Sequence, residues 1–453
     1  MSGRRLALGL LLASLGSPLQ AEAPLEQLQR QIAADNRAYQ WVASLTTEVG
    51  PRLAGTPGDA KAVAWAQRLL REQGFAEVRA EPVQVPRWNR REVRVSLAGD
   101  AEPLAAVALG GSEGGQVQAP VLRVESVADL QARPLEQVRG RIVFFDRRME
   151  RTRDGSGYGP AVDVRVRGAA EAARRGAVGA VIRSIGTSSE RVAHTGTLRY
   201  DSSAARIPAV ALANRDADRL AAQLAQGAVT LSLSVGARYL KDAMSANVIG
   251  EIPGETDEIV LLGAHLDSWD VGTGANDDGA GVAIVIEAAR QIARLGIKPR
   301  RTLRVVLFAN EEFGLSGAKA YARAHAASLD RHVLAMEADF GSGAVFRLDA
   351  GVDPAQWPAI EAMARALAPF GVALGRNGAR GGADLTPLRE RGVPVLDPRQ
   401  DGSRYFDLHH TAADTLESID RAGLEQNVAV YAIAAWLAAQ HPAGFGRLPR
   451  LPE

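Results

Sequence analysis

From Ser245 onward, short apolar runs alternate strictly with longer amphipathic segments. The apolar runs have the length of buried strands and read DEIVLLGAHL, TLRVVLFAN, HVLAMEADF and GVPVLDP. Helical patterns such as GAGVAIVIEAARQIARLG separate them. This order predicts an α/β fold in which a mixed central sheet carries helices on both faces. Ligands of such sheets gather beyond the carboxyl ends of the strands, so residues that follow strands are the first candidates for a site.

The rest of the chain divides into three parts. Residues 22–100 contain two helical patterns and two alternating runs, and we assign them to the same domain as the second half. Residues 101–236 contain short apolar runs punctuated by Gly and Pro, with two helical patterns among them. We interpret 101–236 as a compact, β-rich inserted domain. The main domain resumes over residues 237–442, which hold the candidate site, and residues 443–453 form a Pro-rich tail.

Residues 1–21 have the pattern of a secretory signal. Arg4 and Arg5 precede an apolar stretch from Leu6 to Leu15, and small residues follow up to Ala21. The apolar stretch is shorter than the ~20 residues of a membrane-spanning helix, which favours a signal over an anchor. We therefore expect an exported protein, periplasmic or extracellular, with no membrane segment after the signal is removed.

Charge and cysteine content exclude several classes of function. The chain has 53 Lys and Arg against 52 Asp and Glu, so it offers no broad basic face for nucleic acid. We expect no nucleic-acid partner. The chain also has no cysteine, which excludes disulfides and thiolate chemistry.

Acidic residues and histidines are concentrated directly after the apolar runs. These residues are His265 and Asp267 after IVLLGA, Glu311 and Glu312 after VVLFAN, Asp339 after VLAMEA, and His409 and His410 after SRYFDL, which we take as a further strand. Asp277 lies in the loop that opens the helix after the first of these strands. Because strand ends share one edge of a sheet, we expect these side chains to meet. Imidazole and carboxylate ligands suit Zn²⁺, and a shared carboxylate is typical of a two-metal site.

Each of these residues taken alone has an ordinary structural explanation. Asp267 and Asp278 could solvate a loop or cap a helix, and Glu311 and Glu312 could begin a helix. His409 and His410 could be an exposed pair. The joint placement after strands of one alternating domain favours a metal site. The remaining histidines, apart from His194, are interpreted as surface residues, namely His325, His332 and His441.

Catalysis needs a general base in addition to metal ligands. Of the adjacent pair Glu311 and Glu312, one side chain can bind metal while its neighbour faces the water that is to be activated. Asp267 lies two residues beyond His265, so in an extended segment both side chains point to the same side. This spacing allows Asp267 to orient the imidazole.

Several segments resemble the secreted co-catalytic zinc aminopeptidases and carboxypeptidases. The matching motifs are HLDSWDVGTGANDDGAG, ANEEFGLSGAKAY, MEADFGSG and HHTAADT. The resemblance also covers GPRLAGTPGDAKAVAWAQRLLREQGF and GGADLTPLRERGVPV, and the insertion resembles a protease-associated domain. Nearly all of the mature chain is therefore included. Asn310 departs from the pattern, because relatives often have Ala there.

The resemblance implies two Zn²⁺ ions and a role for each site residue. One zinc would be held by His265 and Asp339 and the other by Glu312 and His410, with Asp277 bridging them. Glu311 would be the general base, and Asp267 would orient His265. The resemblance further implies a cis peptide bond between Asp277 and Asp278, a supporting role for His409, and substrate contacts by His194 and Asp384.

The implied function is that of an exported zinc exopeptidase acting on dipeptides or on the N-terminal residue of short peptides. A metal-bridging hydroxide would attack the peptide carbonyl, with Glu311 passing the proton to the leaving amine. A carboxypeptidase acting on C-terminal residues is the main alternative. Glutaminyl cyclases and receptor-like binding proteins share the scaffold, but the intact ligand set favours hydrolysis. The resemblance also suggests a homodimer.

Overall fold

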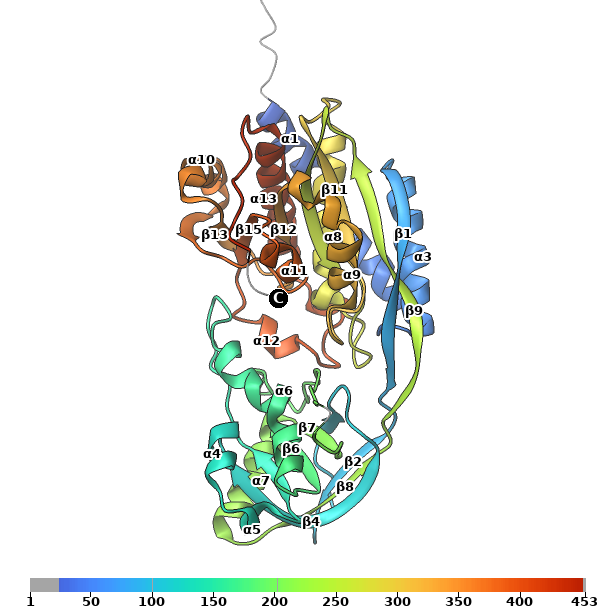
Figure 1. The fold of residues 1–453 in the computed structure, drawn as a ribbon, viewed down its shortest axis with the longest axis vertical. Coiled ribbons are helices and arrows are strands. Elements are labelled where there is room, and N and C mark those ends of the chain that lie inside the picture. Colours follow the sequence, from blue (N-terminus) through green and yellow to red (C-terminus); the bar gives the residue numbers. More distant parts are fainter. Residues whose placement is uncertain (1–23, 100, 202, 451–453) are drawn as a thin grey trace, which may run out of the picture.

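The computed structural model describes residues 24–99, 101–201 and 203–450. It has two sheets that lie one above the other along the long axis of the molecule (Figure 1). The predicted signal, residues 1–21, lies outside the described residues. Within the described ranges, no helix combines the length and the apolar character needed to cross a membrane.

The first sheet has eight strands in the order β1-β9-β11-β10-β12-β15-β13-β14. Their bounds are β1 (Ala76–Asn89), β9 (Arg238–Ile252), β11 (Arg301–Phe308), β10 (Thr256–His265), β12 (His332–Glu337), β15 (Val395–Gln400), β13 (Val345–Gly351) and β14 (Ala373–Asn377). The central strands from β11 to β15 are parallel, whereas β9 pairs antiparallel with β1 and β11, and β13 with β15. The sheet is therefore mixed, as predicted.

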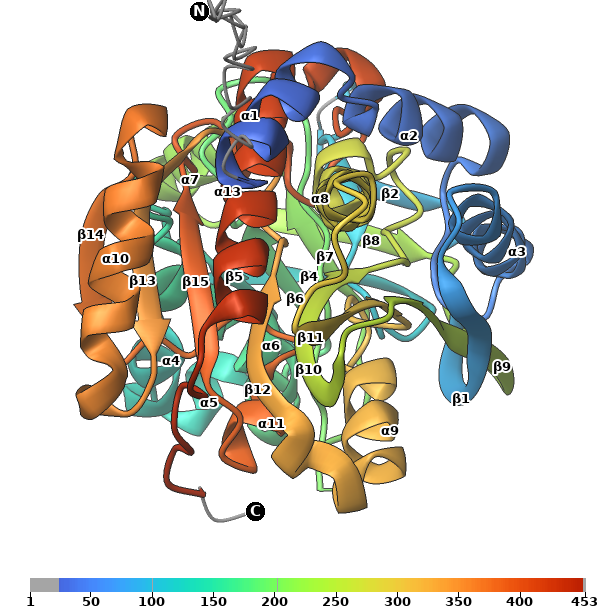
Figure 2. The ribbon, with the colours of Figure 1, turned by 90° about the horizontal axis from the view of Figure 1, so that it is seen from above.

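Helices cover both faces of this sheet because successive side chains of its central strands point to opposite faces and most of them are apolar. Val260 and Leu262 of β10 pack in one cluster with α8 (Ala280–Ala293) and α13 (Arg421–Gln440). Ile259 and Leu261 pack in another with α9 (Ser316–Ala324) and α11 (Thr386–Glu390). Figure 2 shows the strands from β14 to β1 with α8 and α13 on one side and α9 and α11 on the other. The prediction of helices on both faces is confirmed.

The remaining helices of this part lie around the sheet. They are α1 (Pro24–Ala34), α2 (Ala38–Ser44), α3 (Pro57–Glu72) and α10 (Trp357–Leu367). This part of the molecule also contains short helical turns at Leu45–Val49, Ala275–Gly279, Ala326–Arg331, Pro354–Gln356, Ala368–Phe370 and Leu416–Ser418.

The second sheet has seven strands in the order β2-β8-β4-β5-β6-β7-β3. Their bounds are β2 (Val93–Leu97), β8 (Thr230–Val235), β4 (Gly115–Val124), β5 (Ile142–Phe145), β6 (Gly179–Arg183), β7 (Ala209–Leu212) and β3 (Ala106–Ala108). Four helices accompany it: α4 (Val127–Ala132), α5 (Leu135–Val138), α6 (Tyr158–Arg174) and α7 (Asn214–Gln226). Strand β2 pairs with β8, so this sheet begins before residue 101.

Two local expectations were wrong. The residues before His409 form a helical turn, α12 (Tyr405–Leu408), rather than a strand, because Tyr405 and Phe406 are needed as apolar contacts for the second part of the molecule. His332, expected at the surface, is fully buried at the start of β12. Its Nε2 atom lies 2.8 Å from the Tyr321 hydroxyl, so a buried hydrogen bond replaces contact with water.

Candidate metal centre

Three neighbouring parallel strands deliver most of the predicted site residues to one edge of the first sheet. Strand β10 ends at His265, Glu311 and Glu312 follow β11, and Asp339 follows β12. Because β11, β10 and β12 are adjacent and parallel, their carboxyl ends meet. His410 reaches the same place from the turn that follows α12.

The five predicted ligand side chains converge around the carboxylate of Asp277. One oxygen of Asp277, Oδ1, lies 3.1 Å from His265 Nε2, and the other, Oδ2, lies 3.3 Å from His410 Nε2. His265 Nε2 is also 3.3 Å from Asp339 Oδ1, and His410 Nε2 is 3.0 Å from Glu312 Oε2. Asp277 therefore stands between two ligand pairs, one on each side.

These separations fit divalent metal ions. Two ligands on one tetrahedral zinc, each bonded at ~2.0–2.1 Å, lie about 3.3 Å apart. Oδ2 of Asp277 and Oε1 of Glu312 are buried and accept no hydrogen bond from the described residues. Buried carboxylate oxygens without donors are costly unless a cation satisfies them. The donor set and its spacing therefore suit zinc or a similar divalent ion.

The electrostatics of the cluster also favour bound cations. Burial raises the pKa of Glu312 and of Asp278 well above their usual values. Burial opposes a charged His265, but the carboxylates of Asp339, Asp267 and Asp277 hold its pKa well above the usual value. The crowded carboxylates thus bind protons or pair with the imidazolium, although the buried Arg52 offsets part of their charge. Divalent ions would neutralise the rest.

The loop that carries Asp277 is held by backbone hydrogen bonds to two further carboxylates. The Asp277–Asp278 peptide bond is cis, as the resemblance implied. Asp414 accepts hydrogen bonds from the backbone N–H groups of Asn276, at 2.7 Å, and Asp277, at 3.1 Å. Asp278 accepts from the N–H groups of His265 and Gly281, each at 3.0 Å. Sequence reasoning missed Asp414, although it lies in the HHTAADT motif.

Asp267 contacts both the predicted base and the first histidine. Its Oδ1 atom accepts a 3.0 Å hydrogen bond from the backbone N–H of Glu311. His265 Nδ1 lies 3.1 Å from the backbone carbonyl of Asp267 and 3.7 Å from its Oδ1. The backbone of Asp267, more than its side chain, therefore meets the imidazole, while the carboxylate fixes the segment that carries Glu311.

Glu311 lines the cavity beside the ligands, and burial raises its pKa to about 8. The residue before it, Asn310, has φ of 59°, in the left-handed region. Asparagine adopts this region more readily than most residues do, which gives a backbone reason for Asn310 at this position.

The two adjacent histidines differ in their distance from the shared carboxylate. The rings of His409 and His410 stack with centroids 3.5 Å apart. Nε2 of His409 lies 3.8 Å from Asp277 Oδ2, compared with 3.3 Å for His410, and only His410 also reaches Glu312. The geometry therefore favours His410 as the ligand, with His409 behind it.

The two predicted substrate contacts lie outside the cavity wall. His194 is buried, and its Nδ1 atom lies 2.7 Å from the backbone carbonyl of His409. The Asp384 carboxylate is fully buried, and neither of its oxygens has a hydrogen-bond partner among the described residues. The neighbouring Ala383 lines the cavity instead.

A cavity of about 340 Å³ lies over the candidate metal ligands and is walled by both parts of the molecule. Glu311, Glu312 and Asp339 line it from the first part, and Tyr158 and Arg165 of α6 line it from the second. Its volume is near the lower end of the ~300–1,000 Å³ typical of ligand pockets. Sequence reasoning missed Tyr158 and Arg165, although the helical spacing of α6 places Arg165 on the same face as Ala161 and Gly168 and could have indicated its burial.

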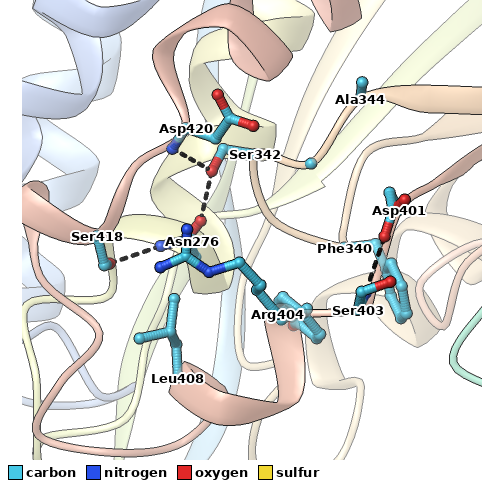
Figure 3. Close-up of a pocket in the computed structure, with 12 residues that line it drawn as sticks. Asn276, Phe340, Ser342, Ala344, Asp401, Ser403, Arg404, Leu408, Ser418 and Asp420 are labelled. Atoms are coloured by element: carbon cyan, nitrogen blue, oxygen red, sulfur yellow. Dashed lines mark hydrogen bonds between the residues drawn. The ribbon is translucent and has the colours of Figure 1, made fainter. Parts of the chain in front are cut away.

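A second cavity, of about 350 Å³, lies on the other side of Phe340 and Tyr405, which line both cavities. The rings of Phe340 and Tyr405 stack with centroids 4.7 Å apart. Figure 3 shows that polar groups of the second cavity bond to one another: Asn276 donates to Ser418 and accepts from Ser342. This self-paired lining distinguishes it from the cavity over the ligands.

Comparison with known proteins agrees with this geometry. The model of Peptidase family M28 matches residues 247–435. Carboxypeptidase Q of Mus musculus is 36% identical over 89% of this chain and 86% of its own length, and that of Homo sapiens is 33% identical over 90% and 86%. A solved Peptidase M28 precursor from Shewanella amazonensis SB2B has 47% identity and a TM-score of 0.92, covering 95% of this chain and 98% of its own. An aminopeptidase from Aneurinibacillus sp. strain AM-1 has 26% identity and a TM-score of 0.64, covering 94% and 98%.

Proposed function

The chain belongs to peptidase family M28, and from that premise we propose that it is an exported zinc exopeptidase. Its substrates would be dipeptides or the N-terminal residues of short peptides. Peptide hydrolysis is common to the named relatives, which include both carboxypeptidases and aminopeptidases. The proposal adds the export, the number of zinc ions, the role of each residue and the choice of substrate end.

One observation carries the proposal: both oxygens of Asp277 face histidines, and Glu311 lines the cavity that lies over them. Asp277 would be shared by two zinc ions, one also held by His265 and Asp339 and the other by Glu312 and His410. Zinc in such a site supplies a water of lowered pKa and polarises the peptide carbonyl.

The residues of the chain would carry out proton transfer, positioning and substrate binding. The Glu311 carboxylate takes the proton of the attacking water and delivers it to the leaving amine. Asp267 holds the backbone of Glu311 and lies beside His265, so it is a positioning residue. The acidic surroundings of the site suit a substrate α-amine. A role of Asp384 in substrate binding is proposed from the resemblance alone, since its carboxylate is fully buried and only the neighbouring Ala383 lines the cavity. His194 supports the turn of His409 and His410.

We also propose the division of the chain into domains. A peptidase domain of residues 22–100 and 237–442 would be interrupted by a protease-associated-like insertion of residues 101–236, followed by a tail. The separate second sheet supports this division, and β2 favours a start of the insertion before residue 101. Export follows from the signal pattern of residues 1–21, and homodimerisation is proposed from the resemblance alone.

A carboxypeptidase is the second candidate. It is favoured by the name of the carboxypeptidase Q relatives and by the position of Arg165 in the cavity wall. For a dipeptide the two activities cleave the same bond. A receptor-like protein without activity is disfavoured, because every ligand position is filled.

Glu311→Gln tests the proposed mechanism. The amide keeps the shape of the side chain but cannot accept the proton, so kcat for unblocked dipeptides should fall by about 10²–10⁴-fold. Zinc content should stay unchanged, because Glu311 is not among the proposed ligands. Glu136→Gln, at an exposed position on α5, is the matched control and should leave kcat unaltered. Full turnover by the purified Glu311→Gln enzyme would remove Glu311 from its role.

A further inference from the structure

A connection in the second part of the molecule, residues 194–198, reaches the ligands proposed for one zinc ion. The connection lies between β6 and β7 of the second sheet. The N–H of Gly110 donates a 2.9 Å hydrogen bond to the carbonyl of Gly196, and the N–H of Leu198 donates at 2.8 Å to the carbonyl of Gly110. Segment 194–198 is therefore anchored in the second part.

The backbone of Thr195 in this segment pairs with His410 through two contacts. The N–H of Thr195 donates a 3.0 Å hydrogen bond to the backbone carbonyl of His410. The carbonyl of Thr195 lies 3.3 Å from Nδ1 of the His410 ring. A proton on Nδ1 would point to this carbonyl and leave the lone pair of Nε2 facing Asp277 and Glu312. Thr195 thus fixes both the position of His410 and the nitrogen that it offers to a metal.

The side chain of Thr197, two residues further on, contacts Glu312. Its hydroxyl donates a hydrogen bond to the backbone carbonyl of Glu312. Glu312 is the other ligand proposed for the same zinc ion, and its Oε2 atom lies 3.0 Å from His410 Nε2. Glu312 lies in a turn beyond the end of β11, so contacts with other parts of the chain restrict its position. One segment therefore holds both members of this ligand pair.

The other proposed ligand pair is held without the second part of the molecule. Nδ1 of His265 lies 3.1 Å from the backbone carbonyl of Asp267, which has the role that the Thr195 carbonyl has for the other histidine. Among the residues that the structure describes, no group of residues 101–236 forms a hydrogen bond with His265 or Asp339. The two proposed metal sites therefore differ in which part of the molecule builds them.

Arg90 fixes segment 194–198 against the first part. Its Nη1 atom donates a 2.8 Å hydrogen bond to the Thr195 hydroxyl, and its Nε atom donates at 2.9 Å to Oδ1 of Asp270, in the loop that follows β10. The side chain is buried, and its guanidinium carbon lies 5.0 Å from the ring centre of Trp88 and 5.3 Å from that of Trp269. The placement of the segment against the ligands is therefore built into the folded chain.

We propose that Thr195 and Thr197 are positioning residues of the Glu312–His410 metal site, and that this site needs the second part of the molecule to bind zinc with full affinity. The site of the other ligand pair binds zinc independently of these two threonines. The hydrogen bonds hold two ligands that are far apart in sequence, so less order has to be imposed when the metal binds. This inference rests on the proposed two-zinc function.

Thr197→Val tests the inference by zinc titration of the metal-free mature enzyme, which gives a Kd for each ion. Valine has the shape of threonine but cannot donate to the Glu312 carbonyl. We expect one Kd to rise about 10–100-fold, the usual cost of losing a group behind a ligand, and the other to change less than about threefold. Thr197→Ser keeps the hydroxyl and should retain the wild-type values.

Thr187→Val is the matched control. The Thr187 hydroxyl also joins the two parts of the molecule, because it donates a 2.8 Å hydrogen bond to Asp407, but it contacts no proposed ligand. Both Kd values should therefore stay at their wild-type level. A rise as large as that in Thr197→Val would overturn the specific role of segment 194–198.

Two further variants identify the affected ion. In Asp339→Asn, which removes a ligand of the independent site, adding Thr197→Val should still raise the Kd of the remaining zinc about 10–100-fold. In His410→Ala, which removes a ligand of the dependent site, adding Thr197→Val should change the remaining Kd less than about threefold. A residue that acts through a ligand site has no further effect once that site is lost.

Equal rises of both Kd values in Thr197→Val, or no rise in either, would overturn the inference and leave the two-zinc peptidase standing. A wild-type chain that bound fewer than two zinc ions would overturn both. If Thr197→Val does not fold, hydrogen exchange of the wild-type chain replaces it, because a contact that strengthens zinc binding is itself strengthened by zinc. Protection of the Thr195 amide should then increase at one of the two binding steps only. Equal increases at both steps, or none, would overturn the inference.

Discussion

The two walls of the cavity over Asp277 are built on opposite electrostatic principles. The wall from the first sheet crowds carboxylates with two histidines, and several of these groups have pKa values far from their usual range. The wall from α6 presents a cation, Arg165, held by a neutral phenol and a glycine. Each wall carries a charge that the protein leaves unbalanced. We propose metal ions as the missing partner of the first wall and, if the enzyme is a carboxypeptidase, a substrate carboxylate as that of the second.

This difference predicts that the two walls have different roles. The acidic wall should carry out catalysis, and the cationic wall should determine which substrate is cleaved. Substitutions on the acidic wall should remove metal or turnover for every substrate. Substitutions on the cationic wall should change which substrate is cleaved and leave the metal in place. An acidic-wall variant that changed specificity alone, or an Arg165 variant that lost zinc, would break the comparison.

The largest effect is expected for His410→Ala. Loss of a proposed ligand should lower zinc content and reduce kcat/KM by more than the ~10–100-fold typical of residues behind the ligands. His409→Ala is the matched variant at the adjacent, stacked ring, which lies 3.8 Å from Asp277, and it should retain zinc. Metal analysis after gel filtration checks both. If His409→Ala lost zinc and His410→Ala retained it, His409 would be the ligand and His410 the supporting residue.

Asp267→Asn should have a smaller effect within the same wall. The amide oxygen can still accept from the Glu311 backbone, but the charge beside His265 is lost. We expect a ~10–100-fold decrease in kcat with zinc retained. Asp257→Asn, at an exposed position, serves as the control. A variant with wild-type kcat would show that the charge of Asp267 is not needed and that a side-chain oxygen accepting from Glu311 is sufficient.

The smallest effect concerns stability, and it should appear only when zinc is removed. Burial raises the pKa of Glu311 to about 8 and that of Asp414 to about 7. In the unfolded chain such carboxyls lose their protons near pH 4. Four buried histidines, His194, His332, His409 and His410, have lowered pKa values and oppose this effect below pH ~6.5. Between pH ~6.5 and ~8 the folded metal-free chain therefore binds more protons than the unfolded chain, and its free energy of unfolding should fall as pH rises.

Zinc should oppose this trend by neutralising the same carboxylates. At a free zinc concentration ~100-fold above Kd, binding adds ~2.7 kcal/mol to the free energy of unfolding. Denaturant titrations at pH ~6.5 and ~8 with zinc or with chelator measure both effects. Metal-free protein that became more stable as pH rose would contradict the assignment of an acidic wall that depends on cations.

Much of the fold and part of the site could be predicted from sequence, because both rest on local patterns. Apolar runs of strand length fix the central sheet, and His265, Glu312 and Asp339 lie directly after such runs, so their convergence follows from parallel pairing. The mixed α/β fold is confirmed. The ligand and base roles stay proposals for which the observed distances are the support.

The remaining features depend on tertiary contacts that no local pattern reports. Arg165 lies on the apolar face of α6 and Arg167 on its charged face, but the pattern does not report that the apolar face of this helix borders the cavity. Asp414 acts through backbone N–H groups of a loop far away in sequence. His332 looked like a surface residue because its neighbours in sequence are polar, but the Tyr321 hydroxyl from α9 meets its ring.

The zinc content of the purified chain tests the central claim most directly, since that claim is that Asp277 is shared by two metal ions. We expect two zinc ions per wild-type chain by elemental analysis and fewer than two in Asp277→Asn, with the folded state of both verified by circular dichroism. A folded Asp277→Asn protein that retained two zinc ions, or a wild-type chain that bound none when saturated with zinc, would contradict the account.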